Sequence, residues 1–364
     1  MNIILTGGHA ATTAAAVAEE IISQKKNWKL YFIGAKGAIE GKSVATLESE
    51  IMPRLGVEFL PVKTGRIQRK FSRWTIPALL RTPVGFIQSF YYLLKYRPQV
   101  VLSFGGYASF PVVFSAWLLR IPVIVHEQTS ASGRANKMAI PFASKIVLAR
   151  EESLAYFPLS KSVVTGNPVM KDVAGIGMKK ELSHPPVLFI TGGSRGSQSI
   201  NEIVEKCLID LLSKFRVYHQ TGDLDFARFN HIKGQLPRNL SLNYFVFSRI
   251  DPLKISETYE KSDIVLSRAG ANTVSEIMTV RRPAVLVPLP ISYLDEQTKN
   301  ALSAESFGIA RIIYQKDLTP EGLVDGLDEI LTHRGEILEA VAKKKGPDTH
   351  AAKSIVNTIA KFVK

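Results

Sequence analysis

Six polar or glycine-rich segments each follow a short apolar run and precede residues of helical character. Ligands of open parallel sheets bind beyond the carboxyl ends of the strands, where the free N–H groups of a helix N-terminus attract anions. We therefore expect these segments to carry the ligand contacts. They are residues 6–9, 104–109 and 126–129 in the first half of the chain, and residues 191–197, 267–276 and 288–300 in the second half.

The three segments of the second half have residue types that suit a nucleotide diphosphate. Small residues in the first of them permit close approach of the backbone to a pyrophosphate, and Arg195 adds a charged donor. In the second, Arg268 and the amides near Gly270 suit phosphate, while Glu276 on the next helical turn can accept both hydroxyls of a ribose. Each segment alone also fits a plain strand-to-helix turn, and Asp295 in the third also fits a helix cap. Their expected convergence favours a nucleotide site.

The first half offers a candidate base. His9 stands at the carboxyl end of a strand and before a helix, where an imidazole can accept a proton near neutral pH. A single histidine is more often structural, but the two polar loops of the same half favour a catalytic role. His126 and Glu127 are neighbours in an extended segment, so their side chains cannot both face one pocket.

Two other signals are weaker. Asp223 and Asp225 have the spacing of a metal-binding pair, but they open a helix, where acidic residues also favour the helix dipole. Helix capping is therefore the preferred interpretation. The excess of basic residues suggests nucleic acid, but no zinc spacing, glycine-rich aromatic strand motif or basic heptad region accompanies it. We therefore expect no nucleic-acid partner and no metal.

The net charge is unevenly distributed. The 364 residues carry a formal charge of +14, which indicates an anionic partner. Up to Gly166 there are 20 basic and 9 acidic residues, a surplus of +11, and the rest of the chain contributes +3. With 46% hydrophobic and 21% charged residues, the composition is that of a globular protein and excludes a disordered or fibrous one.

One stretch of the first half mixes cations with large apolar side chains, as does a segment that lies on an anionic bilayer. An ordinary helix with a solvated basic face fits the stretch equally well. The residues of this expected membrane contact are Arg66, Arg69, Lys70, Phe71, Arg73, Trp74 and Leu79.

Apolar runs alternate with amphipathic segments throughout, which is typical of parallel sheets wrapped by helices. We predict an α/β fold of two Rossmann-like, doubly wound parallel-sheet domains that face each other across a cleft, with boundaries at 1–166 and 167–347. Residues 348–364 form a last helix that can pack back on either domain. The predicted strands are 2–6, 29–33, 57–62, 100–104, 123–126, 145–148 and 162–165, then 186–191, 215–219, 242–247, 263–266, 284–288 and 309–314.

Three features indicate a protein kept inside the cell. The lone cysteine, Cys207, excludes an internal disulfide and reads as a core residue. The N-terminus reads as a first strand and not as a signal peptide. The most apolar stretch, residues 110–125, is interrupted by Arg120 and Pro122 and is too short to span a membrane.

Taken together, the segments resemble the GT-B glycosyltransferases, and within them the MurG family of bacterial transferases. Members of that family add N-acetylglucosamine to undecaprenyl-pyrophosphoryl-muramyl-pentapeptide (lipid I) to make lipid II. The likeness covers essentially the whole chain. It rests on residues 104–109 (FGGYAS), 121–128 (IPVIVHEQ), 165–169 (TGNPV), 192–197 (GGSRGS), 268–276 (RAGANTVSE) and 295–301 (DEQTKNA).

The resemblance implies that the second domain binds UDP-N-acetylglucosamine, without a cofactor. Ser194 and neighbouring amides would contact the diphosphate, Glu276 the ribose and Gln297 the sugar, with a backbone contact to uracil near Ile250. The muramyl hydroxyl would displace UDP with inversion, His9 being the candidate base and Arg268 a stabiliser of UDP. The implied donor-site residues are Gly193, Ser194, Arg195, Gly196, Ile250, Arg268, Gly270, Ala271, Thr273, Glu276 and Gln297.

The resemblance also implies that the first domain holds lipid I at the cytoplasmic face of the bacterial membrane. The enzyme would bind that anionic surface peripherally. The implied acceptor-site residues are Gly8, Gly105, Gly106, Tyr107, Glu127, Gln128, Thr129 and Asn167.

The chain departs from the family pattern in a shorter loop around His9 and at Thr129, Met170 and Arg195. A sibling transferase that acts on another lipid-linked or lipid acceptor is therefore the second hypothesis. A sugar-nucleotide isomerase would need several acid–base groups, yet Glu127 is the one evident loop carboxylate of the first domain. A relative that only binds the nucleotide is the remaining alternative.

Overall fold

A computed structural model describes residues 1–364 except 9, 25–26, 38–44, 66–74, 194 and 364, and the side chains of residues 75–80 also lie outside the description. The chain divides into two compact units. The first unit comprises Met1–Lys171 and Asp348–Lys364, and the second comprises Asp172–Pro347.

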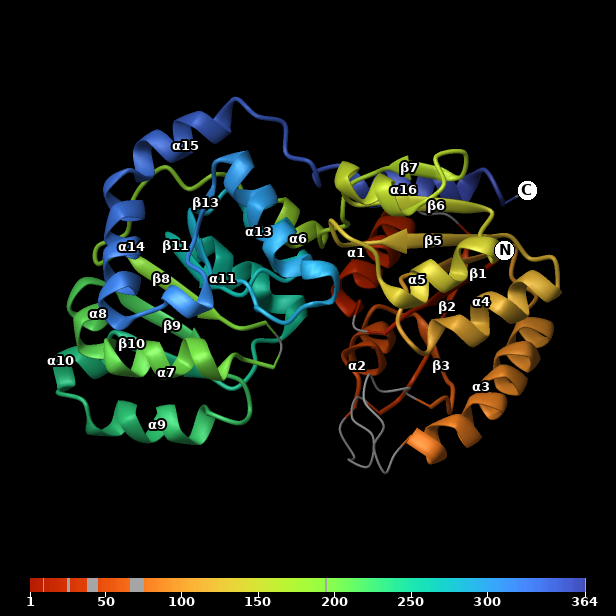
Figure 1. The fold of residues 1–364 in the computed structure, drawn as a ribbon, viewed down its shortest axis with the longest axis horizontal. Helices are drawn as coiled ribbons and strands as arrows, with labels where there is room; N and C mark the ends of the chain where they lie inside the picture. Colours follow the sequence, from red (N-terminus) through yellow and green to blue (C-terminus); the bar gives the residue numbers. More distant parts are fainter. Residues whose placement is uncertain (9, 25–26, 38–44, 66–74, 194, 364) are drawn as a thin grey trace. The chain divides into compact units, whose positions relative to one another are not determined.

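The first unit is built on a parallel sheet, whose described strands number seven in the order β3-β2-β1-β4-β5-β6-β7 (Figure 1). Its central strands are short apolar runs buried on both faces, as a sheet covered by helices requires. The strands are β1 (Asn2–Thr6), β2 (Lys29–Gly34), β3 (Glu58–Pro61), β4 (Val100–Ser103), β5 (Val123–Glu127), β6 (Lys145–Leu148) and β7 (Ser162–Val164). The helices are α1 (Ala11–Ser23), α2 (Leu47–Arg54), α3 (Thr75–Tyr96), α4 (Ser109–Leu118), α5 (Arg134–Ala139) and α16 (Ala351–Ala360).

The second unit repeats this architecture, with six described parallel strands in the order β10-β9-β8-β11-β12-β13. They are β8 (Val187–Thr191), β9 (Arg216–Gln220), β10 (Tyr244–Phe247), β11 (Ile264–Ser267), β12 (Ala284–Leu286) and β13 (Ala310–Ile312). The helices are α6 (Lys171–Ala174) at the junction, α7 (Gln198–Lys206), α8 (Leu208–Lys214), α9 (Phe226–Gln235), α10 (Arg238–Ser241), α11 (Ile255–Lys261), α12 (Ala271–Val280), α13 (Glu296–Phe307), α14 (Pro320–Thr332) and α15 (Arg334–Ala342).

The strand order reverses once in each sheet, between β1 and β4 in the first unit and between β8 and β11 in the second. The predicted fold class, two doubly wound parallel-sheet α/β domains, is confirmed. Each predicted strand is present. Because a crevice opens at a reversal of strand order, the loops after these four strands are where ligands should bind.

The last helix packs on the first unit. Helix α16 lies against α1 and buries Ile355 and Ile359. The preceding Asp348 accepts two hydrogen bonds from Arg150, at 2.6 and 2.7 Å, and one from the Asn167 backbone N–H at 2.7 Å. The last of these connects Asn167 to the first unit, which extends to Lys171.

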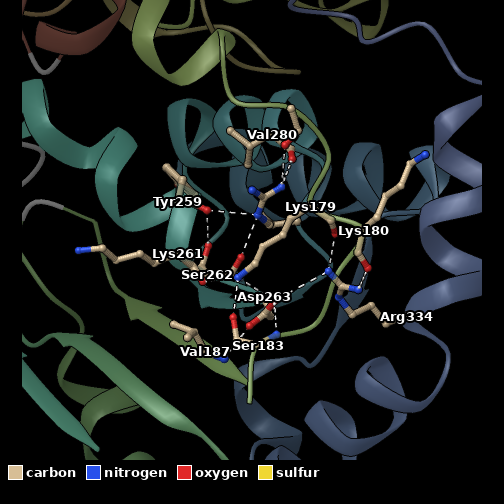
Figure 2. Close-up of polar contacts among 12 residues, drawn as sticks. Lys179, Lys180, Ser183, Val187, Tyr259, Lys261, Ser262, Asp263, Val280 and Arg334 are labelled. Atoms are coloured by element: carbon tan, nitrogen blue, oxygen red, sulfur yellow. Dashed lines mark hydrogen bonds and ion pairs between the residues drawn. The ribbon is translucent and has the colours of Figure 1, made fainter. Parts of the chain in front are cut away.

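A buried ionic cluster lies at the amino end of the second sheet, just before β11 (Figure 2). Asp263 is fully buried and pairs with Lys179 at 3.0 Å and with Arg334 at 3.8 Å. It also accepts the Val187 backbone N–H at 2.8 Å. This Asp263 cluster fixes the segment between α6 and β8 to the second unit.

Candidate active site

A cavity of about 530 Å³ opens at the carboxyl edge of the second sheet, next to the reversal of strand order. Most of the residues that line it belong to the loops after β8, β11 and β12 and to the helices that follow those loops. They are Gly192, Gly193, Gly196, Ser197, Gln198, Ser199, Glu202, Arg268, Gly270, Thr273, Leu289, Gln297 and Gln315.

The loop after β8 requires glycine at two positions. A Cβ on Gly192 would lie 2.3 Å from the Gly196 carbonyl carbon, and a Cβ on Gly196 would lie 2.0 Å from the Thr221 oxygen. Gly196 also has a φ of +73°, which favours glycine. The loop can therefore close tightly on itself before α7. Since the Ser197 side chain makes no cap hydrogen bond, the first N–H groups of α7 remain available to an anion.

Arg268 places a buried positive charge in this cavity. Its Nε donates to Ser197 Oγ at 2.9 Å, and its Nη1 donates to the Val287 oxygen at 3.0 Å. Its Nη2 donates to Gln315 Oε1 at 2.7 Å and to Ser199 Oγ. These partners are neutral oxygens, so they orient the guanidinium without cancelling its charge. Burial lowers the pKa of Arg268.

Glu276 lies one helical turn beyond Thr273 on α12 and is half-buried. Its Oε2 accepts a hydrogen bond from the Tyr259 hydroxyl at 2.9 Å. Burial raises the pKa of Glu276 to about 7, and the tyrosine hydrogen bond acts in the opposite direction. The carboxyl therefore changes its charge near neutral pH.

Gln297 opens α13 at the third loop of the cavity. Its Oε1 accepts the Leu289 backbone N–H at 3.0 Å, which fixes the amide so that Nε2 is the donor it can offer a ligand. Leu294 and Asp295 before it both have positive φ, at 52° and 56°. Asp295 accepts from Thr298 Oγ1 at 2.8 Å, and its side chain makes no hydrogen bond to the backbone of α13.

In the first unit the loops after β1 and β4 touch each other. The Gly8 N–H donates to the Gly105 oxygen at 2.9 Å. A Cβ on Gly106 would lie 2.7 Å from the Gly8 oxygen. Glycine at these positions thus lets the two loops meet, and His9 follows directly after Gly8 in the sequence.

The family models match both units. Residues 3–148 match the glycosyltransferase family 28 N-terminal domain, and residues 187–359 match the glycosyltransferase family 28 C-terminal domain. The chain belongs to glycosyltransferase family 28.

Relatives of this family 28 chain extend over nearly its whole length. A Bacillus cereus protein is 31% identical over 363 residues, which cover 94% of this chain and 95% of the relative. It is named UDP-N-acetylglucosamine–N-acetylmuramyl-(pentapeptide) pyrophosphoryl-undecaprenol N-acetylglucosamine transferase 2. A Clostridium botulinum protein with the same name, without the final number, is 31% identical over 375 residues and covers 100% of this chain and 99% of its own length.

Solved structures share the fold. MurG from Acinetobacter baumannii has a TM-score of 0.71 at 24% identity and covers 99% of each chain. A UDP-GlcNAc 2-epimerase from Neisseria meningitidis has a TM-score of 0.68 at 16% identity, covering 99% of this chain and 100% of its own. At these identities the likeness concerns the fold of the family 28 chain and not its reaction.

The cavity of the family 28 chain brings together part of the expected donor set. Gly193, Gly196, Arg268, Gly270, Thr273 and Gln297 line it, and Ala271 begins the adjoining helix. Arg195 is exposed and lies outside the lining. Glu276 lies one helical turn beyond the lining residue Thr273 and is itself outside the lining. Ile250, after β10 at the sheet edge, is also outside it. Ser194 lies outside the described residues.

Sequence reasoning missed several residues of this site. Ser199 and Gln315 hold Arg268, and Tyr259 holds Glu276. Gln315 follows β13, whose carboxyl end lies at the same sheet edge as the cavity. Its position after a predicted strand could therefore have indicated that it belongs to the site. Nothing in the spacing of residues along the sequence indicates the contact between Tyr259 and Glu276.

The expected cap at Asp225 is wrong in detail. Asp225 occupies the N-cap position of α9, but its side chain makes no cap hydrogen bond. Instead, it accepts from Asn201 Nδ2 at 2.7 Å and pairs with Arg228 at 3.2 Å. Asp223 lies 3.7 Å from Arg249. The part of the chain that the structure describes contains no group of three or more His, Cys, Asp or Glu residues able to hold a metal ion.

The residues expected to form the acceptor site differ in burial and in their contacts within the first unit. Glu127 is 2% exposed and accepts four hydrogen bonds from its own loop: from the Thr129 N–H and hydroxyl, the Gly133 N–H and the Asn136 amide, at 2.7–3.1 Å. It therefore shapes the loop after β5 instead of facing a ligand. Asn167 is fully buried.

Two other acceptor-side residues make contacts within the first unit. Gln128 accepts from Thr13 Oγ1 at 3.3 Å. The Tyr107 hydroxyl donates to the Gly37 oxygen at 3.3 Å, which ties the loop after β4 to the loop after β2. His9, the candidate base, lies outside the described residues.

The predicted membrane contact falls largely outside the description. Residues 66–74 are not described, and Leu79 belongs to α3 with its side chain undescribed. Among the described residues, no helix is both long and apolar enough to cross a bilayer.

Proposed function

We propose that this enzyme transfers N-acetylglucosamine from UDP-N-acetylglucosamine to the muramyl sugar of lipid I, with inversion, and forms lipid II. The observation that carries the proposal is the cavity after β8, where a closed glycine loop and the buried charge of Arg268 suit a diphosphate. Full-length relatives carrying the name of this activity support the choice of sugar donor and acceptor.

Each part of the donor binds to the loop whose residue types suit it. The diphosphate binds to Ser194, the neighbouring amides and the N-terminus of α7, where Arg268 adds positive potential. The Glu276 carboxylate accepts the ribose hydroxyls, and the Gln297 amide donates to the sugar. The backbone near Ile250 contacts uracil.

The reaction is an in-line displacement. His9 accepts the proton of the acceptor hydroxyl while that oxygen forms a bond to C1 of N-acetylglucosamine. The bond from C1 to the phosphate oxygen breaks, and UDP leaves with the added negative charge. Helix N-termini and Arg268 stabilise that charge, so we expect turnover without a divalent cation.

An activity assay tests this proposal directly. Purified protein with UDP-N-acetylglucosamine and a lipid I analogue should release UDP at the same rate with and without EDTA. Omission of the acceptor gives the hydrolysis control. Turnover with a different lipid-linked acceptor but not with lipid I would identify the sibling transferase, and donor binding without turnover on any acceptor would leave only a binding protein.

Because the proposed acceptor is a lipid, we propose that the first unit, which binds it, contacts the cytoplasmic surface of the cell membrane. Helices α3 and α4 pack together (Figure 1). Their exposed apolar side chains recur at helical spacing. Exposed Arg81, Lys95 and Arg120 belong to the same two helices or follow them. This α3–α4 apolar surface consists of Val84, Ile87, Tyr91, Leu94, Trp117 and Leu118.

Charge on this surface should detach the enzyme from membranes. Ile87 is 70% exposed and Leu94 50%, so the double change Ile87→Glu and Leu94→Glu should fold normally. Binding to vesicles that contain phosphatidylglycerol should fall at least about tenfold, because two apolar side chains no longer enter the bilayer. Vesicle sedimentation measures this, and UDP binding should be unchanged.

The matched control is Leu224→Glu, an 80% exposed leucine of the second unit, which should bind vesicles as the wild type does. If the double variant also binds normally, the contact lies elsewhere. The basic and aromatic side chains of residues 66–74 would then be the next candidates.

A further inference from the structure

Glu276 has a buried partner that fixes its position. The Tyr259 hydroxyl donates to Glu276 Oε2 at 2.9 Å, from α11 to α12. Tyr259 is 1% exposed. With Oε2 engaged by the tyrosine, the second carboxylate oxygen, Oε1, is the atom that Glu276 can present to a ligand.

Tyr259 is itself held by contacts to its ring and to its backbone oxygen. Its ring meets Phe189 of β8 edge-on, with ring centroids 5.6 Å apart. Its backbone oxygen accepts from Ser262 Oγ at 2.9 Å and from Arg282 Nε at 3.1 Å (Figure 2). A side chain fixed at the ring and at the backbone leaves its hydroxyl little freedom.

Arg282 links this tyrosine to the amino end of the sheet. It is 2% exposed and also donates to the backbone oxygens of Ser262, Val280 and Gly177 at 2.6–3.1 Å. Asp263 is the next residue after Ser262, so the Asp263 cluster and Tyr259 belong to one buried polar network. The network therefore restrains the position of the Tyr259 hydroxyl.

We propose that Tyr259 is a positioning residue for the donor ribose, because its hydroxyl holds the Glu276 carboxylate in the rotamer that accepts the ribose hydroxyls. The inference rests on the proposed function, in which Glu276 is the ribose contact. It assigns to a buried side chain outside the cavity lining an indirect effect on donor affinity, exerted through Glu276.

The same hydrogen bond also affects the pKa of Glu276. Burial raises the pKa of this carboxyl to about 7, while the Tyr259 hydroxyl lowers it. Helix α13 packs against α12 and carries Glu296, Lys299 and Glu305, but among the described residues burial and the tyrosine are the two causes of the shift. The tyrosine stays protonated throughout, because burial raises its own pKa well above 10.

The sign of the pH effect follows from the chemistry. A ribose hydroxyl donates to the ionised carboxylate, so donor affinity should rise as pH passes upward through about 7. Without the phenol, the pKa of Glu276 rises further. The upward step in affinity should then move to higher pH.

The test is Tyr259→Phe, with the Kd for UDP-N-acetylglucosamine measured by calorimetry from pH 6 to 9. We expect the midpoint of the affinity profile to move up, and the donor KM at pH 7 to rise about tenfold, as for loss of a hydrogen bond to a charged group. The value of kcat should change less than about twofold, and affinity should recover largely at pH 9. A purely structural role would weaken binding equally at every pH.

The control is Tyr244→Phe. Tyr244 is another fully buried tyrosine of the second unit, and its hydroxyl contacts His219 Nδ1 at 2.9 Å rather than Glu276. This variant should keep the wild-type midpoint. 3-Fluorotyrosine at position 259 keeps the hydrogen bond with a more acidic phenol, so it should move the midpoint down and covers the case in which phenylalanine prevents folding.

The variant Glu276→Gln distinguishes the ribose contact of Glu276 from the positioning role of Tyr259. It should weaken donor binding and remove the pH step. If Glu276→Gln binds the donor as the wild type does, the ribose assignment itself fails. If Glu276→Gln is weakened but Tyr259→Phe and the fluorotyrosine protein both keep the wild-type midpoint, the ribose assignment stands and the role of Tyr259 is overturned.

Discussion

Replacement of His9 by alanine should lower kcat by about 10²- to 10⁴-fold, the usual contribution of a general base, and change donor affinity by less than about twofold. His9 follows Gly8, which contacts Gly105 and Gly106 of the loop after β4 in the first unit. All the residues that line the cavity belong to the second unit and His9 belongs to the first, so we expect donor affinity to depend little on this imidazole. Initial rates of UDP release and calorimetry with UDP-N-acetylglucosamine measure the two quantities.

The histidine control is His231→Ala. His231 is an exposed residue of α9 in the second unit, and its ring contacts Gln235 on the same helix. Its removal should leave kcat unchanged. An alanine variant of His9 with wild-type kcat in single-turnover conditions would show that another group accepts the acceptor proton. A rise in donor KM at constant kcat would instead move His9 into the donor site.

Much of the fold could be predicted because strand and helix periodicity are local. Runs such as Ile264–Ser267 are apolar, short and bounded by polar residues, and these properties select a buried parallel strand without reference to the rest of the chain. Helix α2 carries a weaker signal in the sequence, because Ile51 and Met52 are its only buried apolar residues and Pro53 lies inside it.

The partners within the site were less predictable because they come from distant segments. Gln315 reaches Arg268 across 47 positions of sequence, and the contact depends on β12 and β13 pairing in one register. Glu127 was hard to assign although its partners are close in the sequence: its four hydrogen-bond donors come from residues 129–136. Whether a loop folds inward on a carboxylate or leaves it to a ligand depends on loop closure, which residue spacing does not encode.

Replacement of Arg268 by methionine should lower kcat about 10²- to 10³-fold, as does removal of a preorganised charge at a site where negative charge develops. The leaving UDP gains charge as the C1–O bond breaks, and the guanidinium lies in the cavity lining, where its partners among the described residues are neutral oxygens. Loss of these hydrogen bonds leaves buried acceptors such as the Val287 oxygen without the guanidinium donor, so stability should also fall by about 1–3 kcal/mol. Thermal unfolding measures that loss, and rates should be taken well below the new Tm.

Arg268→Lys distinguishes charge from geometry at this site. Lysine keeps the charge but cannot reproduce the planar set of donors, so its kcat should fall between those of the wild type and the methionine variant. Arg311→Met, which removes an exposed arginine of β13, should have no effect on kcat. If Arg268→Met raises the donor KM while kcat stays constant, the charge binds donor and transition state equally, and stabilisation of the leaving UDP must come from the helix N-termini alone.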